Sequence, residues 1–211
     1  MQSEYRHIVI EGNIGAGKTT LAKELSAELD AKLILERFEN NPFLASFYAD
    51  RERYALQVEL FFLADRYHQL SKNVLGDIFQ DYTVYDYHFA KSAIFSTINL
   101  TKDEHSLFQS LYGIMERFTP QPDIVVYVHH GIDKLQQQIQ ARNRSYEEQI
   151  PSDYLEKVHH HYLQYFKEVK GFPIVVLDFE QVKNANEKYV LKAIKDVLST
   201  KWVNGLSILN H

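Results

Sequence analysis

The sequence predicts an α/β protein in which a five-stranded parallel sheet lies between two layers of helices. Five short stretches rich in Val, Ile, Leu or Tyr are bounded by polar or turn-forming residues, as is typical of buried strands. Longer segments with helical periodicity separate them, and strands that alternate with helices form parallel sheets covered on both faces. The chain has 211 residues and no internal repeat or Pro/Gly-rich linker, so we expect one domain over residues 1–211.

These patterns place the elements in chain order. The expected strands are His7–Glu11, Lys32–Leu35, Thr83–Asp86, Asp123–Val128 and Ile174–Leu177. The expected helices are Lys18–Leu29, a long one near Phe47–Leu75, Asp103–Phe118, Ile132–Ala141, Pro151–Val169 and Glu187–Leu198. In sheets of this kind ligands bind beyond the carboxyl ends of the strands, so we expect the functional side chains there.

Composition and charge limit the class of partner. The formal net charge is −5 and the pI is about 6.1, which argues against a duplex nucleic-acid binder and favours a small-molecule substrate. The absence of cysteine excludes disulfides and thiolate-bound zinc. The sequence has no signal-like N-terminus and no long apolar run, so we expect a cytoplasmic protein without a membrane partner.

A glycine-rich loop follows the first expected strand. It reads G-N-I-G-A-G-K-T-T and matches the P-loop pattern G-x-x-x-x-G-K-[ST] between a strand and a helix. Glycines let backbone N–H groups point at phosphate oxygens, the lysine reaches the β- and γ-phosphates, and the threonine after it holds Mg²⁺. The expected nucleotide-binding residues are Gly12, Asn13, Ile14, Gly15, Ala16, Gly17, Lys18, Thr19 and Thr20. A phosphotransferase is therefore favoured over a glycine-rich turn without a ligand.

Further segments that bear on the kind of phosphotransferase are spread over nearly the whole chain. They are Glu36, Asn41–Leu44, Phe47-Tyr48, Leu60–Gln69, Asp86-Tyr87-His88 with Lys91 and Ile94-Phe95, and Arg142-x-Arg144 with Glu147–Pro151 and Tyr154-Leu155. In this order and spacing the chain resembles the deoxynucleoside kinase family, specifically its bacterial deoxyguanosine/deoxyadenosine kinase branch. The resemblance implies a P-loop kinase-type three-layer fold and transfer of the γ-phosphate of MgATP to a deoxynucleoside 5′-hydroxyl. Members of the family are commonly homodimers.

Two acidic residues at strand ends are the candidates for the general base and for magnesium binding. Glu36 follows the second strand, and the matching Glu of the family is the proposed general base; a solvated Glu beside Arg37 is the alternative. Asp86 ends the third strand, where an acid orients Mg²⁺. The family usually continues with a catalytic Arg, but Tyr87-His88 follows here, and whether Tyr87, His88 or Lys91 replaces that Arg stays open.

Two further segments resemble donor-side parts of the family. Arg142 and Arg144 lie in a segment at about 138–150 that resembles the lid, whose arginines neutralise charge on the transferring phosphate; a solvated helix end is the alternative. Because residues two apart face opposite ways on a helix, either the two arginines touch different phosphates or the helix has already frayed there. Asp178 and Phe179 resemble the loop against the donor adenine.

The acceptor residues come from other helices. Tyr48 and Glu148 match the pair that binds the deoxyribose 3′-hydroxyl, with Glu147 as the alternative acid, and Phe95 matches the Phe that stacks on the base. Glu59 aligns with the family's base-reading Gln, and an ionised Glu offers two acceptors to the N1–H and N2–H₂ donors of guanine. This favours deoxyguanosine over deoxyadenosine, unless Glu59 only pairs with Arg66 or Arg51.

Two other functions remain as alternatives. A nucleoside monophosphate kinase resembling the thymidylate kinases would need cations around the acceptor's phosphate, and the acidic Glu36 and Glu59 argue against it. A non-catalytic nucleotide-binding switch of the GTPase kind would carry an Asn-Lys-x-Asp motif, which the sequence lacks.

Overall fold

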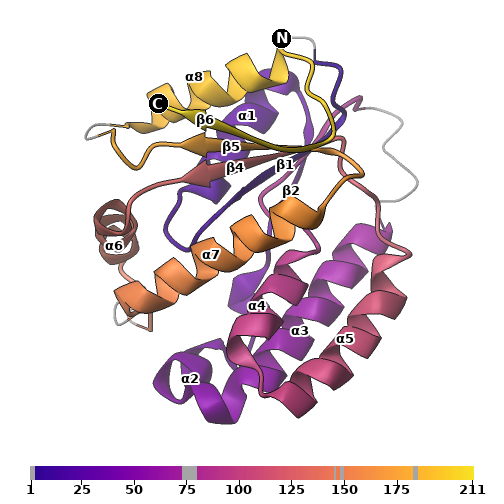
Figure 1. Ribbon diagram of the computed structural model, residues 1–211, viewed down its shortest axis with the longest axis vertical. Coiled ribbons are helices and arrows are strands. Elements are labelled where there is room, and N and C mark those ends of the chain that lie inside the picture. The colour runs from indigo at the N-terminus through magenta and orange to yellow at the C-terminus, as the bar shows by residue number, and fades with distance from the viewer. Residues whose placement is uncertain (1–2, 73–79, 145, 148–149, 183–184) are drawn as a thin grey trace.

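The sheet is parallel throughout and carries helices on both faces (Figure 1). The computed structural model describes residues 3–72, 80–144, 146–147, 150–182 and 185–211. The strand order is β2 (Lys32–Ile34), β3 (Thr83–Tyr85), β1 (His7–Gly12), β4 (Ile124–His129), β5 (Pro173–Asp178) and β6 (Gly205–Asn210). The three-layer α/β fold expected from the sequence is confirmed.

The number of strands is corrected from five to six. β6 pairs with β5 in parallel from Gly205 opposite Pro173 to Asn210 opposite Asp178. Its residues are mostly half-buried or exposed, as on the edge of a sheet, so it lacks the continuous apolar run by which the other strands were recognised. Pairing with β5, far away in the sequence, decides that this segment is a strand.

Two hydrophobic clusters hold the layers together. On one face, α1 (Lys18–Leu29) and α8 (Glu187–Leu198) pack on the sheet through Leu25, Ile194, Ile8 and Ile10. On the other face, α7 (Ser152–Glu168) covers the strands through Tyr162, which belongs to the same cluster as Val9. Alternate residues of β1 thus point to opposite faces, as the pleat requires.

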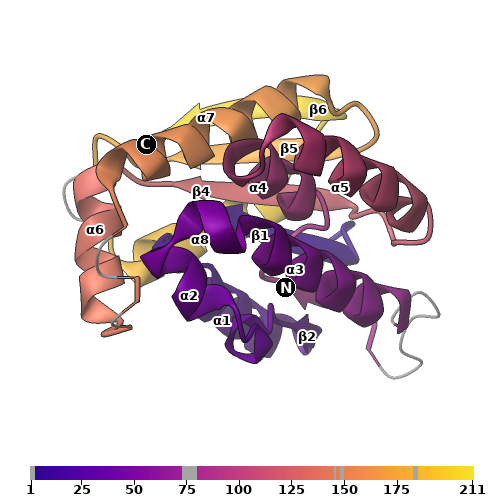
Figure 2. The same ribbon diagram turned by 90° about the horizontal axis from the view of Figure 1, so that it is seen from below.

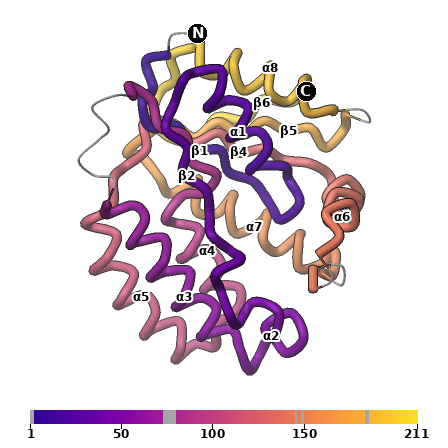
Figure 3. Tube along the Cα trace, turned by 180° about the vertical axis from the view of Figure 1, so that it is seen from behind, coloured from indigo at the N-terminus to yellow at the C-terminus, as the bar shows by residue number. Residues whose placement is uncertain are grey.

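A group of helices extends this second face beyond the sheet. It consists of α2 (Leu44–Ala49), α3 (Arg51–Lys72), α4 (Lys91–Asn99) and α5 (Lys102–Glu116), of which α3, α4 and α5 lie side by side (Figure 2). α6 (Ile132–Ala141) follows β4 on the side of the strands' carboxyl ends. Seen from behind, the loop between β1 and α1 lies at the same end of the molecule (Figure 3).

The long helix expected near Phe47–Leu75 is two helices. The backbone leaves the helical region at Asp50 (φ −148°, ψ 87°), and the Asp50 carboxylate accepts a hydrogen bond from the Arg53 N–H (3.3 Å). Asp50 therefore caps α3, and a short 3₁₀ turn at Phe38–Asn40 precedes α2. The sequence prediction also missed α4. Among the described helices, none is both long and apolar enough to cross a membrane.

Candidate active site

A cavity opens at the carboxyl ends of β1, β2 and β3. Concave sites of this kind are where small-molecule substrates bind. Its lining includes all the described residues that the sequence predicted for catalysis, magnesium or acceptor binding: Lys18, Thr19, Glu36, Tyr48, Glu59, Asp86, Phe95, Arg142 and Arg144. Glu148 lies outside the described residues. The fold thus brings together side chains that come from distant parts of the chain.

The P-loop backbone depends on glycine at specific positions. Gly15 and Gly17 have φ of +84° and +80°, and a Cβ on Gly12 would lie 2.7 Å from the Val128 carbonyl oxygen of β4. The Asn13 side chain ties the loop to α7, because its amide donates to the Leu155 carbonyl oxygen (2.7 Å). The loop is therefore held in shape by its neighbours.

Lys18 folds back over this loop. Its Nζ donates to the carbonyl oxygens of Gly12 (3.0 Å) and Asn13 (2.9 Å). Burial and, after it, the nearby Lys91 lower the pKa of Lys18 to about 8. A phosphate beside this ammonium would replace the two hydrogen bonds to neutral carbonyl oxygens with an ion pair.

A second cavity, of about 730 Å³, lies on the other side of the loop. Gly15, Gly17 and Thr20 line it from the loop side, and Arg142 lines both cavities whereas Arg144 lines only the first. α6 ends at Ala141 with Arg142 as its C-cap, so Arg144 lies beyond the helix, as the second alternative expected. The contacts of the two arginines with phosphates stay a prediction. The Arg144 guanidinium also donates to Glu147 (3.0 Å) and lies over the Phe38 ring, 3.8 Å from its centroid.

Asp178 and Phe179 occupy a different setting from the one the resemblance suggested. Phe179 is 1% exposed, and its ring packs against His130 and His211. Asp178 accepts a hydrogen bond from the Glu180 N–H (2.9 Å). Neither is among the described residues that line the second cavity, where Ala185, Glu187 and Val190 supply this side. Their contact with adenine stays a prediction.

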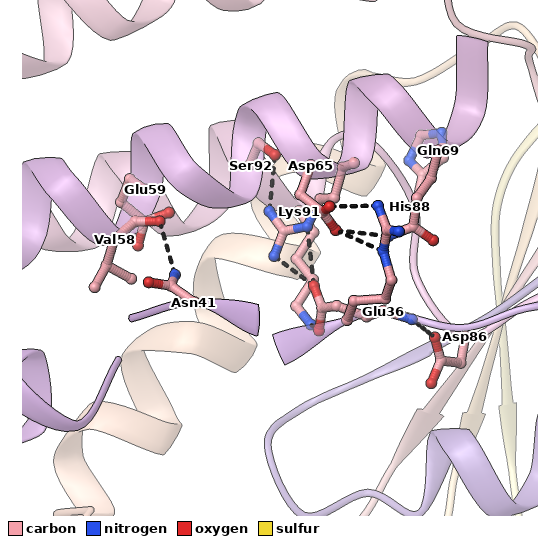
Figure 4. A network of polar contacts seen from close by, with 12 residues as sticks. Glu36, Asn41, Val58, Glu59, Asp65, Gln69, Asp86, His88, Lys91 and Ser92 are labelled. Carbon is pink, nitrogen blue, oxygen red and sulfur yellow. Dashed lines mark hydrogen bonds and ion pairs between the residues drawn. The ribbon is translucent and has the colours of Figure 1, made fainter. Parts of the chain in front are cut away.

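Glu36 is clamped by two cations (Figure 4). Its Oε1 accepts from Arg66 Nε (2.9 Å) and its Oε2 from Lys91 Nζ (2.6 Å). Burial alone would raise the pKa of Glu36, but Lys91 and Arg66 together hold it well below its usual range. Glu36 is therefore a carboxylate at neutral pH, and a weak base while both cations contact it.

The backbone of Glu36 is also bound to Asp86. Asp86 Oδ1 accepts from the Glu36 N–H (2.7 Å) and Oδ2 from the Thr19 hydroxyl (2.6 Å), as the lower part of Figure 4 shows for Glu36 and Asp86. Burial raises the pKa of Asp86. A hydroxyl and a carboxylate oxygen that converge beside the P-loop are the hard oxygen ligands that Mg²⁺ prefers, so the residues present fit this ion.

Tyr87, His88 and Lys91 were the candidates to replace the family's catalytic Arg. Of these three, Lys91 lines the main cavity. Tyr87 is 1% exposed in the core, and the His88 ring packs edge-on against Phe172. Burial lowers the pKa of His88 to about 4. Lys91 begins α4, where the helix dipole disfavours a cation, and its ion pair with Glu36 offsets this.

Glu59 lies deeper in the cavity and is 2% exposed. Its Oε1 accepts from Asn99 Nδ2 (2.7 Å), and Asn99 Oδ1 accepts from the Tyr154 hydroxyl (3.0 Å). Within the described residues, Oε2 has no hydrogen-bond partner. Burial raises the pKa of Glu59 to about 7.

The pairing of Glu59 with Arg66 or Arg51, left open above, does not occur as a hydrogen bond in the described structure. Arg66 binds Glu36 and the Ser92 hydroxyl (2.7 Å) instead, and the Arg51 guanidinium lies 4.1 Å from the centre of the Tyr154 ring. The clamp by Arg66 and the contact with Asn99 were not predicted. Arg66 stands seven residues after Glu59 on one helical face, which was a usable signal, whereas nothing in the sequence marked Asn99.

Tyr48 and Glu147 line the cavity near the lid. The Tyr48 ring stacks on Tyr146, with centroids 5.8 Å apart. Glu147 is 5% exposed and, among the described contacts, its Oε2 has no partner. Glu147 therefore offers the carboxylate that the sequence assigned to Glu147 or Glu148.

Comparison with known proteins places this site in a family. The family model described as Deoxynucleoside kinase matches residues 8–199. The chain belongs to the deoxynucleoside kinase family. It is thus an ATP-dependent phosphotransferase that acts on deoxynucleosides. The two alternative functions, a nucleoside monophosphate kinase and a non-catalytic switch, are set aside.

Individual relatives support this membership. Deoxyguanosine kinase of Bacillus subtilis is 35% identical over 154 residues, which cover 72% of this chain and 73% of that protein. Deoxyadenosine/deoxycytidine kinase of the same organism is 27% identical over 203 residues, covering 92% and 91%. The solved structure of M. mycoides deoxyadenosine kinase with bound dATP superposes with a TM-score of 0.79 at 24% identity and covers 92% of this chain and 99% of that one, which shows the shared fold.

Proposed function

We propose that the protein transfers the γ-phosphate of MgATP to the 5′-hydroxyl of a purine deoxynucleoside and prefers deoxyguanosine to deoxyadenosine. The observation that carries the base preference is the Glu59 carboxyl, buried in the cavity with one oxygen unpartnered among the described residues. The relatives are named for kinases of both purine deoxynucleosides, so the preference must come from the site itself.

The base is bound between Glu59 and Phe95 in this proposal. Ionised Glu59 presents acceptors to the adjacent N1–H and N2–H₂ donors of guanine, while adenine would place an acceptor against one of them. The Phe95 ring stacks on the base, and Tyr48 binds the sugar 3′-hydroxyl together with Glu147 or Glu148. Arg66 positions Glu36, which it contacts, over the P-loop side of the cavity.

The phosphoryl transfer uses the groups at the strand ends. Glu36 accepts the proton of the 5′-hydroxyl as O5′ forms its bond to the γ-phosphorus, and the bond from that phosphorus to the β–γ bridging oxygen breaks to release ADP. Lys18, Lys91 and Arg142 neutralise charge on the transferring group. Thr19 and Asp86 would hold Mg²⁺, which would neutralise charge on the phosphates of the donor.

Lys91 has two roles in this scheme. It contacts Glu36 now, and it lies close enough to Lys18 for the two ammonium groups to repel each other. A triphosphate placed between the two lysines would relieve that repulsion and compete for Lys91. Withdrawal of Lys91 from Oε2 would raise the basicity of Glu36 when the donor arrives.

The test is kcat/KM for the four deoxynucleosides with fixed MgATP at about pH 8, where Glu59 is mostly ionised, in the wild type and in Glu59→Gln. Wild-type enzyme is expected to rank deoxyguanosine first. Glu59→Gln sets an amide NH₂ against a guanine donor, which costs about 1–3 kcal/mol or roughly tenfold to a hundredfold in kcat/KM. The preference is expected to move toward deoxyadenosine or deoxycytidine.

The matched control is Glu52→Gln, the same change at an exposed position of α3. It is expected to leave the ranking of the bases unchanged. An identical ranking in wild type and Glu59→Gln would show that Glu59 does not read the base. The cytoplasmic location and the homodimer stay predictions.

A further inference from the structure

One carboxylate oxygen of Glu59 accepts a hydrogen bond, and the other has no hydrogen-bond partner among the described residues. Asn99 at the end of α4 donates to Oε1, and the Tyr154 hydroxyl of α7 in turn donates to Asn99. Glu59 lines the cavity, and its Oε2 is buried with no hydrogen-bond partner in the described part of the chain. The side chain can therefore meet the base with Oε2 either as an acceptor or, when protonated, as a donor.

The charged groups around Glu59 come from each element packed against it. Arg66 of α3 and Lys91 of α4 favour its ionised form, while Glu36 after β2 disfavours it, and Tyr154 of α7 faces it across Asn99. Both cations are already bound to Glu36. Their combined effect on Glu59 is reduced by that carboxylate, and burial outweighs them, so that both protonation states are accessible near pH 7.

We propose that Glu59 recognises purines in two protonation states, the carboxylate binding guanine and the carboxylic acid binding adenine. The inference rests on the proposed function of this cavity as the acceptor site. It makes the base preference of the enzyme dependent on pH, with deoxyguanosine favoured on the alkaline side and deoxyadenosine on the acidic side.

The hydrogen-bond patterns follow from the two forms. In the carboxylate, Oε1 keeps a lone pair beside the Asn99 bond, so both oxygens accept, from guanine N1–H and N2–H₂. In the acid, Oε2–H donates to adenine N1 while Oε1 accepts from adenine N6–H₂. An amide in the same place has one fixed pattern and cannot switch.

Asn99 is the positioning residue of this arrangement. Because its NH₂ points at Oε1, the proton of the acid form is directed to Oε2, which faces the base. Its hydrogen bond also lowers the pKa of Glu59 against the effect of burial. Asn99→Leu, of similar shape but without the donor, is expected to raise the pKa of Glu59 further.

The experiment measures kcat/KM for deoxyguanosine and deoxyadenosine at fixed saturating MgATP between about pH 6 and about pH 8. The quantity that decides is the ratio of the two values, because the titration of Lys18, Glu36 and other catalytic groups affects both substrates and cancels. In wild type the ratio is expected to rise with pH by up to about tenfold per pH unit, since each unit changes the ratio of ionised to protonated carboxyl tenfold.

Two variants complete the test. In Glu59→Gln the ratio is expected to be independent of pH, and in Asn99→Leu the rise is expected to move to higher pH, in protein whose thermal unfolding confirms that it is folded. A wild-type ratio that is constant within about twofold, or an equal slope in Glu59→Gln, would overturn the proposal. If neither purine deoxynucleoside is phosphorylated at any pH, the proposed function fails instead.

Discussion

Glu36 makes its side-chain ion pairs with two residues that stand 30 and 55 positions away in the chain. This clamp keeps the carboxylate ionised and oriented into the cavity before any substrate is bound. Glu36→Gln preserves the size and one accepting oxygen, turns an NH₂ toward the other cation, and cannot accept the 5′-hydroxyl proton. Turnover is therefore expected to fall by about 10²–10⁴-fold with a much smaller change in KM for the nucleoside.

Steady-state kinetics with the preferred deoxynucleoside checks this expectation. Glu39→Gln, an exposed position in the same segment, serves as the control and is expected to behave as wild type. An unchanged kcat in Glu36→Gln would assign the base role to another carboxylate, with Asp86 the next candidate.

The protonation of Lys18 is expected to make ATP binding depend on pH. The pKa of the buried ammonium is about 8 in the free protein, and bound phosphates would favour its charged form and raise that pKa. Below about pH 8 the lysine is already charged, whereas above it ATP binding must take up a proton. ATP affinity is therefore expected to fall by up to about tenfold per pH unit above pH 8.

Equilibrium titration with MgATP across this range measures the effect. Lys18→Ala is expected to bind ATP weakly, without this pH dependence, and to lose turnover while its thermal unfolding stays cooperative. Lys23→Ala, an exposed lysine of the same helix, is the control. Near-normal turnover in Lys18→Ala would contradict the kinase mechanism assigned to the P-loop.

At the scale of elements, α4 is the one that bears most directly on specificity. Its first residue is Lys91 and its last is Asn99, so a single helix of nine residues contacts both Glu36 and Glu59. α3 and α5 both pack against it (Figure 2). The stability of α5 therefore supports the position of both site residues.

A capping box begins α5. The Thr101 side chain accepts from the backbone three residues later, and the Glu104 carboxylate accepts from the Thr101 N–H (3.0 Å). Thr101→Ala removes half of this reciprocal arrangement and is expected to lower the free energy of unfolding by about 1 kcal/mol. Chemical denaturation measures the change.

Thr97→Ala is the matched control for this prediction. Thr97 is exposed in the interior of α4, and among the described contacts its hydroxyl donates to the Ala93 carbonyl oxygen (2.9 Å). The same substitution there removes no cap and is expected to be neutral or slightly stabilising, because Ala is the better helix former. Equal losses at the two sites would mean that the box contributes nothing.

At the scale of the whole molecule, an apolar stripe lies on the outer surface of α5. Leu107 and Ile114 are 55% and 61% exposed, and Phe118 just beyond the helix is 62% exposed. Their spacing of seven and four puts them on one helical face. We propose that a second copy of this chain covers the stripe, in keeping with the homodimer that the family resemblance implies.

Replacement of Leu107 and Ile114 together by Glu is expected to convert the dimer to a monomer. Sedimentation or light scattering measures the mass in solution. The control is Lys102→Glu, which changes the net charge by the same two units at an exposed position on another face of α5. A wild-type protein that is monomeric at micromolar concentration would remove the proposal.

Local sequence patterns predicted the P-loop, five of the six strands and most of the residues that meet in the cavity. Those features are encoded locally: Gly12–Thr20 is one continuous motif, and strand and helix periods are set by near neighbours in the chain. Glu36 and Asp86 could be placed because parallel strands end at one edge of the sheet.

The tertiary structure alone decided what these residues touch. β6 is a strand because β5 pairs with it, and Glu36 is clamped because α3 and α4 bring Arg66 and Lys91 to it. Glu59 looked like a permanently ionised carboxylate in the sequence, but burial beside Asn99 brings its pKa to about 7. Partners and pKa values depend on packing and the loss of water, which join residues that no local pattern connects.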